Sequence, residues 1–404
     1  MASDDLSFPP SRRHSAFQQL EAFLSSVESY AERRNYLEPG HGNVSRLSPA
    51  IRTRLVLETE IIEATRKRFP AHRVEKFEQE VWWRLYWKGW LEMRPSVWSE
   101  YREDLSGLEW SERALEITSG KSGVSIMDHF AGELIETGYL HNHARMWWAA
   151  FWVHVEKLPW QLGADFFLRY LHDGDAASNT LSWRWVAGLH TKGKCYLVRR
   201  SNLEEFVDRE ILDANSEGLE RLEGVSPLPV IPVDPPVPVP LPGGALPPLK
   251  GRFGCWIHDE DLFLESSPLS SLQPSAVAAF CPTGLWEREC YSKEKQIFLS
   301  KALEDGAGRG GGHFGILSAF LTVDVLSDAI AEWAVEKKLT AVVAMRPFVG
   351  PLADELPAIE TRLRKSGIEL ILVRRSDDVA IMNKATAGFF GFWKKTKEDR
   401  AFLT

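Results

Sequence analysis

The chain of 404 residues lacks several features that mark whole classes of protein. It has only four cysteines, and none of them forms a CxxC pair. We therefore expect no zinc site, no disulfide framework and a reducing, cytoplasmic location. No run of 18 apolar residues occurs, and the opening MASDDLSFPPSRRHS has no apolar core. Neither a membrane span nor a secretory signal is expected.

Positive charge does not dominate the chain, because its 48 lysines and arginines are outnumbered by 56 acids, which gives a net charge of −8. This balance argues against nucleic-acid binding through overall charge, but it leaves room for a local basic groove. One candidate is the stretch 184–200, which has no acid and contains Arg184, Lys192, Lys194, Arg199 and Arg200. It can supply contacts to phosphates; the alternative is a solvated surface strand.

Proline is concentrated in one place and divides the chain. Ten of the 23 prolines lie between positions 227 and 248. Such a run favours the polyproline II conformation, so we interpret 226–250 as a semi-rigid linker. A ligand for a proline-binding module is the alternative. The linker separates two predicted domains, 1–225 and 251–404.

The two domains differ in the spacing of their apolar residues. In 51–69 and 73–92 these residues recur every three or four positions, which predicts helices. After the linker, strands are expected to alternate with amphipathic helices, which favours an α/β domain with a mostly parallel sheet. The expected strands are 254–264, 276–282, 340–345 and 368–374, and the expected helices are 326–339 and 355–367. The glycine-rich stretch 306–315 is interpreted as a flexible loop.

Two helical patterns combine polar and aromatic side chains. Glu80, Trp83 and Arg84 share one helix face, which is unusual for a core, although an amphipathic surface helix is the alternative. Asn142, Arg145 and Met146 share another face in apolar surroundings, so Asn142 and Arg145 are expected to be buried. A buried arginine needs a partner, and Asp173 and Asp175 are the candidates. The three segments look like walls of one polar cavity.

The segment DGDAASN (173–179) also imitates a calcium loop. A calcium loop requires glycine at its sixth position, where this chain has Ser178. No metal site is predicted.

Taken together, four motifs resemble those of the photolyase/cryptochrome family of blue-light flavoproteins. They are GNVSRLSP (42–49), QEVWWRLYW (79–87), GYLHNHARMWWAAF (138–151) and LHDGDAASNTLSWRWVAG (171–188). The resemblance covers residues 15–206 and implies a helical FAD-binding domain. It matches FAD contacts to Tyr30, Ser45, Arg46, Leu47, Ser48, Phe77, Arg84, Arg145, Asp173, Asp175 and Asn179. Within this set, Arg145 is expected to pair with Asp173, and Asn179 to face the flavin N5.

The resemblance also implies a photochemical role for tryptophans. Trp183 and Trp160 match two members of the family's electron-carrying chain, although packing remains the alternative for most of the 16 tryptophans. Trp110 lies about three residues out of register with the outermost member. Glu80, Trp83, Asn142 and Met146 match residues that contact a cyclobutane pyrimidine dimer. The expected function is therefore light-driven repair of such dimers, with DNA, possibly single-stranded, as the partner.

Several departures keep other functions open. The α/β part looks like the family's antenna domain but follows the FAD-binding part, so the order is permuted. Val44 replaces a threonine, and Leu181-Ser182 replaces a glycine pair. A cryptochrome-like photosensor without repair activity is the main alternative, and a flavin-bearing remnant with another role is a weaker one. Whether a second, antenna chromophore binds is left open.

Overall fold

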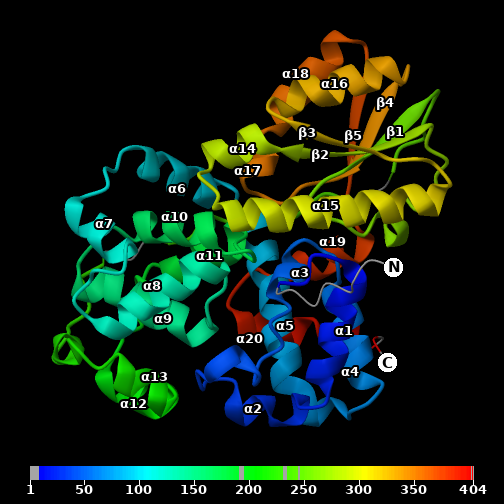
Figure 1. Cartoon of the computed structure of the whole chain (residues 1–404). Coiled ribbons are helices and arrows are strands. Elements are labelled where there is room, and N and C mark those ends of the chain that lie inside the picture. Colours follow the sequence, from blue (N-terminus) through cyan, green and yellow to red (C-terminus); the bar gives the residue numbers. More distant parts are fainter. Residues whose placement is uncertain (1–8, 191–194, 231–233, 244–245, 402, 404) are drawn as a thin grey trace, which may run out of the picture.

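The computed structural model describes residues 9–190, 195–230, 234–243, 246–401 and 403. A helical part and a part with one β-sheet lie against each other (Figure 1). The helical part contains α1 (Arg13–Leu24), α2 (Tyr30–Arg33), α3 (Ser48–Arg52), α4 (Glu58–Arg66), α5 (Ala71–Glu92), α6 (Ser96–Ser106), α7 (Glu112–Thr118), α8 (Ser125–Thr137), α9 (Asn142–Ala150), α10 (Trp160–Tyr170), α11 (Ala176–Val186), α12 (Arg200–Phe206) and α13 (Arg209–Ala214). Among the described residues, no helix has both the length and the apolar character needed to cross a membrane.

The second part is built on a five-stranded parallel sheet with the order β3-β2-β1-β4-β5. β2 and β4 are buried along their whole length, as expected for strands covered on both faces. The predicted fold class, a helical domain plus an α/β domain, is thereby confirmed. The elements are β1 (Phe253–Ile257), β2 (Ala276–Pro282), α14 (Thr283–Arg288), α15 (Lys293–Phe314), β3 (Ala319–Val323), α16 (Leu326–Glu336), β4 (Ala341–Met345), α17 (Pro351–Asp354), α18 (Leu356–Lys365), β5 (Glu369–Val373), α19 (Ser376–Met382), α20 (Phe389–Lys395) and α21 (Lys397–Ala401).

The prediction of a flexible loop at 306–315 is wrong, because this stretch continues helix α15 to Phe314. The glycines allow the helix to lie close to its neighbours. A Cβ atom at Gly310 would lie 2.8 Å from Ile257 Cδ1, and one at Gly306 would lie 3.0 Å from Leu262 Cδ2. The helix propensity lost at these glycines is therefore offset by packing that a larger residue would prevent.

The expected strand 254–264 is also too long, since β1 ends at Ile257. The acids that follow turn away from the sheet toward buried arginines. Arg52 contacts Asp259 (2.7 Å) and Glu260 (3.0 Å), and Arg375 Nη2 donates to Asp261 (2.8 Å). The junction between the two parts is therefore a buried network of charges, which alternation along a strand did not reveal.

The last three helices leave the sheet and return to the helical part. α19 and α20 pack against α5, and Trp82 on α5 donates its indole N–H to Thr396 Oγ1 (3.2 Å). The proline-rich segment is held here too, because Val239 N–H donates to the carbonyl of Met93 (2.9 Å) and Leu241 N–H to Asn383 (2.7 Å). The predicted unit 251–404 therefore includes helices that cover the other unit, and the division into domains stays a prediction.

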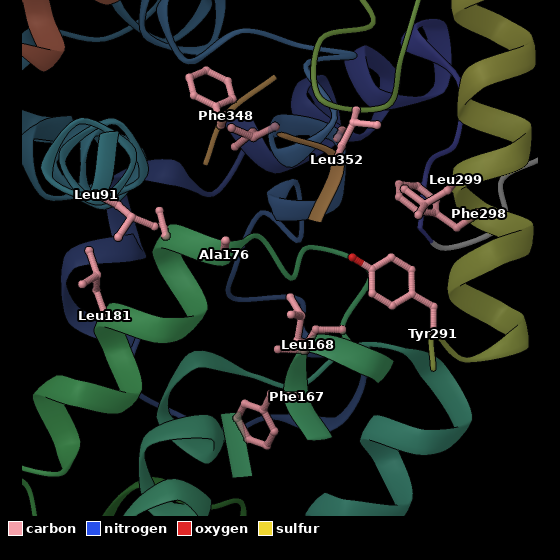
Figure 2. Close-up of a cluster of buried hydrophobic side chains, with 14 of the residues drawn as sticks. Leu91, Phe167, Leu168, Ala176, Leu181, Tyr291, Phe298, Leu299, Phe348 and Leu352 are labelled. Carbon is pink, nitrogen blue, oxygen red and sulfur yellow. The ribbon is translucent and has the colours of Figure 1, made fainter. Parts of the chain in front are cut away.

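One apolar core runs through both parts (Figure 2). It combines Leu168 of α10 and Ala176 of α11 with Phe298 and Leu299 of α15, beside Tyr291. Apolar burial is the main stabilising contribution to such a junction, at about 25 cal/mol per Å². The start of α11, which carries the candidate site, is thus supported from the sheet side.

A lysine is buried in this junction and gives a testable prediction. Lys295 is completely buried, and its ammonium group donates to the carbonyl of Leu168 (2.5 Å) and lies 3.7 Å from the Tyr291 ring centre. Burial, with the nearby charge of Arg52, lowers the pKa of Lys295 to about 7. The unfolded chain keeps this proton up to about pH 10, so the free energy of unfolding rises as the pH increases from about 7 toward 10.

We therefore expect Lys295→Met to stabilise the protein below pH 7, by on the order of 2–4 kcal/mol, and to remove this pH dependence. Denaturant unfolding across this pH range is the measurement. Lys293→Met, an exposed position on the same helix, is the matched control and should change little. Equal stability changes for both variants would contradict the prediction.

Candidate functional site

Two arginines from different helices hold the two aspartates that precede α11. Arg84 of α5 forms an ion pair with Asp175, and its Nη1 donates to the carbonyl of Asp173 (3.3 Å). Arg145 of α9 donates to Asp173 Oδ2 (3.0 Å) and to the carbonyl of Leu140 (2.7 Å). The network joins α5, α9 and the loop before α11, so these three predicted walls do come together.

The network determines the protonation state of Asp173. Burial alone would raise the pKa of this carboxyl, but Arg145, Arg84 and the Ser48 hydroxyl together lower it to about 2. Asp173 is therefore ionised at neutral pH although its side chain is only 3% exposed. Ser48 opens α3, so the segment matched to the FAD phosphates lies beside this network.

The same aspartate segment starts helix α11. Asp175 caps the helix, and its Oδ1 accepts a hydrogen bond from the backbone N–H of Ser178 (2.7 Å). Asn179 is buried and donates from Nδ2 to the carbonyl of Ala164 (2.7 Å). This bond uses one of the two amide hydrogens, so the second hydrogen and the side-chain oxygen of Asn179 can still meet a ligand.

Buried polar atoms without a partner lie at this site. Within the described residues, Asn43 Oδ1, His141 Nε2 and Ser178 Oγ have no hydrogen-bonding partner. His141 Nδ1 accepts the backbone N–H of His143 (3.2 Å), and burial lowers the pKa of His141 to about 3. The neutral ring must therefore carry its hydrogen on Nε2, which is a donor in need of an acceptor. Such atoms fit a large polar ligand with both donor and acceptor groups.

Three more residues of the segment matched to the FAD phosphates, Ser45, Arg46 and Leu47, directly precede Ser48 in the chain. Ser45 Oγ accepts the N–H of Leu47 (3.5 Å), and the Ser45 carbonyl accepts from Gln19 (2.7 Å). Arg46 has a positive φ of 52° and lies 5.5 Å from the Tyr139 ring centre. Leu47 is fully buried and precedes α3. The segment is a structured turn rather than an extended loop.

Two further matched positions pack as aromatic support. Tyr30 meets Phe77 edge to face at 5.3 Å between ring centres, and Phe77 is buried. Burial, with a contribution from Glu80, raises the pKa of Tyr30, so the hydroxyl stays protonated. Glu80 itself forms ion pairs with Arg34 (3.1 Å) and Lys76 (2.9 Å). This carboxylate, matched to a lesion contact, is already paired.

The structure brings the other residues matched to lesion contacts together only in part. The expectation of burial is wrong for Asn142, which is exposed because it is the first residue of α9 and lies before the turns that face the core. Arg145, also expected to be buried, is half-buried, with 21% of its side chain exposed. Its Nδ2 lies 3.8 Å from the sulfur of Met146. Trp83 stacks on Phe389 of α20, with ring centres 3.8 Å apart and planes within 9°. Phe389 was not predicted, because no local pattern links it to a residue 306 positions earlier.

One series of tryptophan ring contacts begins at Trp183. Trp183 is buried and meets Trp148 at 6.2 Å; Trp148 meets Trp152 at 5.2 Å, and Trp152 meets Trp110 at 6.2 Å between ring centres. Trp160 packs on Tyr101 (5.5 Å), and its role beside Trp183 in electron transfer stays a prediction. The aromatic contacts that start at Trp183 therefore lead through Trp148 to the half-buried Trp110.

The described cations of the basic stretch 184–200 differ in their surroundings. Arg184 is half-buried, with its guanidinium 5.9 Å from the Trp160 ring centre. Arg200 forms ion pairs with Glu204 (2.8 Å) and Glu223 (3.2 Å). Lys192 and Lys194 lie outside the described residues.

Arginines and aspartates from three segments, together with unpaired buried donors and acceptors on the same segments, fit a large, charged cofactor. Comparison with known proteins identifies the class: residues 77–210 match the FAD-binding domain of DNA photolyase. The predicted resemblance to the photolyase/cryptochrome family is confirmed for this region, which matches a domain that binds FAD.

Curated relatives are deoxyribodipyrimidine photo-lyases. The chain is 34% identical to that of Streptomyces griseus over 163 residues, covering 38% of this chain and 35% of the relative. It is 33% identical to that of Thermus thermophilus over 194 residues, covering 46% and 44%. This chain thus spans less than half the length of these relatives. A class III photolyase from Agrobacterium tumefaciens is similar in structure with 23% identity and a TM-score of 0.43, covering 52% of this chain and 44% of that one.

The network gives a second prediction. Arg145→Ala removes one of the two arginines that neutralise Asp173, and we expect a loss of stability of up to about 3 kcal/mol together with a lower content of bound FAD. Arg84 still lies 3.4 Å from Asp173, so the carboxylate is not wholly stranded. Thermal unfolding and flavin absorbance per chain are the measurements, with the exposed Arg209→Ala as control. If Arg145→Ala changes neither the thermal unfolding nor the flavin content, the pairing of Arg145 with Asp173 is contradicted.

Proposed function

We propose that this protein is a blue-light flavoprotein that repairs cyclobutane pyrimidine dimers in DNA. The observation that carries the proposal is the Arg84–Asp173–Asp175–Arg145 network, which brings the FAD-type segments of α5, α9 and α11 together. The names of the curated relatives support dimer repair as the reaction. When bound, FAD supplies light absorption and the electron that splits the dimer.

The residues of this chain have separate roles in the proposal. Arg84 and Arg145 hold both aspartates in position, and the side-chain amide of Asn179, anchored on the carbonyl of Ala164, would meet the cofactor. Met146 and Asn142 of α9, together with Trp83 and Glu80 of α5, would contact the lesion. The lesion would be a pyrimidine pair that has left the duplex stack.

One observation favours the photosensor alternative. Glu80 is already paired with Arg34 and Lys76, and Trp83 is already stacked on Phe389. A lesion would have to displace or share these contacts. A photosensor that binds FAD without repairing DNA needs no such rearrangement.

The test is to load the full chain with FAD, reduce it, and illuminate it with an oligonucleotide that contains one thymine dimer. Recovery of thymine absorbance is the readout, and Asn142→Ala is the informative variant, since its exposed side chain makes little contribution to folding. Repair that is weakened in this variant supports the proposal. Flavin binding without repair favours the photosensor, and failure to retain FAD overturns both.

A further inference from the structure

Helix α20 presents an aromatic and basic face that none of the roles above uses. Phe390 is 72% exposed, and no other phenylalanine or tryptophan in the described part of the chain is as open to solvent. Lys394 lies four residues further on, so it shares a helix face with Phe390. Gly391 and Lys395 are exposed beside them.

The helix is firmly anchored on its other side. Phe389 and Phe392 are buried, and Phe392 lies 5.6 Å from Tyr86 of α5 between ring centres. Thr396, which follows α20, accepts the indole N–H of Trp82. Because α20 is held by these contacts, the exposure of Phe390 is a property of a fixed surface and not of a loose chain end.

The local charge differs from that of the whole protein. Between positions 379 and 397 there are four lysines and no acid, whereas the chain as a whole carries a charge of −8. Lys384 is paired with Asp399, and Lys395 donates to Thr386 Oγ1 (2.7 Å). Lys394, Lys395 and Lys397 are all exposed. This face is complementary to an anionic partner.

Phe390 also continues an aromatic stack that leads toward the candidate site. Its ring meets Phe389 edge to face at 5.6 Å, and Phe389 stacks on Trp83. Trp83 in turn lies 5.2 Å from Trp87 between ring centres. An exposed aromatic ring with lysines on the same face is the arrangement that binds unpaired bases and their phosphates.

We propose that α20 is a docking surface for single-stranded DNA, with Phe390 stacking on a base and Lys394 and Lys395 contacting the phosphates. The choice of DNA rests on the proposed function. The surface would hold the strand beside Trp83, so that a part of the chain distant in sequence from the FAD-binding segments contributes to the binding of the partner.

The experiment uses the full FAD-loaded chain and fluorescent oligothymidylate, with and without one cyclobutane dimer, at low salt. We expect Phe390→Ala to weaken binding about five-fold or more, and Phe390→Trp to retain it, because stacking does not depend on a particular aromatic ring. Lys394→Ala should reduce the slope of log affinity against log salt by about 0.7. The controls are Leu317→Ala, which is 98% exposed, and Lys365→Ala in α18, on the far side of the sheet from α20 (Figure 1).

Three results would overturn the inference. The first is that Phe390→Ala binds the oligonucleotides as the parent does, and the second is that the parent has no affinity for either oligonucleotide. The third is that anionic phospholipid vesicles bind to this face while the oligonucleotides do not. Dimer repair and flavin content are measured on the same preparations. If the parent repairs dimers and Phe390→Ala binds the oligonucleotides as tightly as the parent, only this inference is contradicted. If the oligonucleotides bind through Phe390 but the protein retains no flavin, only the proposed function is contradicted.

Discussion

Asp261→Asn is expected to destabilise the protein by about 3–5 kcal/mol, because it leaves the buried Arg375 without its charge partner, whereas Arg54 keeps Asp378. Asp261 is 5% exposed and accepts from Arg375 Nη2 (2.8 Å) and Nε (3.0 Å), with Arg54 at 3.4 Å. Burial would raise the pKa of Asp261, but Arg375 and Arg54 outweigh burial and lower it. The ionised carboxylate is thus part of the junction between the helical part and the sheet.

This shift also predicts how stability depends on pH. A carboxyl with a lowered folded pKa contributes stability that is present above its unfolded pKa, about 4, and is lost as the pH falls through the folded value. We expect the parent to lose stability below pH 4 and Asp261→Asn to lose less. Urea unfolding at several pH values is the measurement. Asp377→Asn, exposed at the start of α19, is the control; if it costs as much as Asp261→Asn, the network is not what holds the junction.

Trp183→Phe is expected to abolish the light-driven bleaching of bound flavin while leaving the flavin in place. Trp183 is 2% exposed and lies on α11 four residues beyond Asn179, which brings it to the same helix face. Phenylalanine keeps most of the apolar volume, so the packing cost should stay below about 1.5 kcal/mol. A phenyl ring is much harder to oxidise than an indole, so the variant should fail selectively in the photochemical step.

The ring contacts also predict which tryptophan acts next. Trp148→Phe and Trp152→Phe should slow the bleaching, because these residues connect Trp183 to the half-buried Trp110. Trp160→Phe is the comparison that distinguishes the two routes, since the family resemblance assigns the relay to Trp160. The measurement is flavin absorbance under illumination with an external thiol. Trp183→Phe bleaching as fast as the parent would mean that electrons enter elsewhere.

Local sequence patterns determined the elements of this protein, because helix and strand periodicity depends on near neighbours. The apolar run in 340–345 and the helical spacing in 73–92 both correspond to observed elements, β4 and α5. Residue types pointed to Asp173 or Asp175 as the partner of Arg145, and the family resemblance implied Asp173, which is the observed partner. These features depend on residue type and on spacing along the chain, so they could be predicted from the sequence alone.

Tertiary structure decided what depends on residues far apart in the chain. The glycines of 306–315 continue a helix because the sheet packs closely against them, and the acids after β1 leave the strand because Arg52, Arg54 and Arg375 meet them in the core. Asn142 is exposed because it begins its helix, which the apolar surroundings in sequence did not indicate. The stacking of Trp83 on Phe389 joins positions 83 and 389, and neither local propensity nor spacing carries information over that separation. The sequence by itself thus determined which chemical groups the site contains, and only the tertiary packing of the helices decided which of them face solvent, because that packing joins residues far apart in the chain.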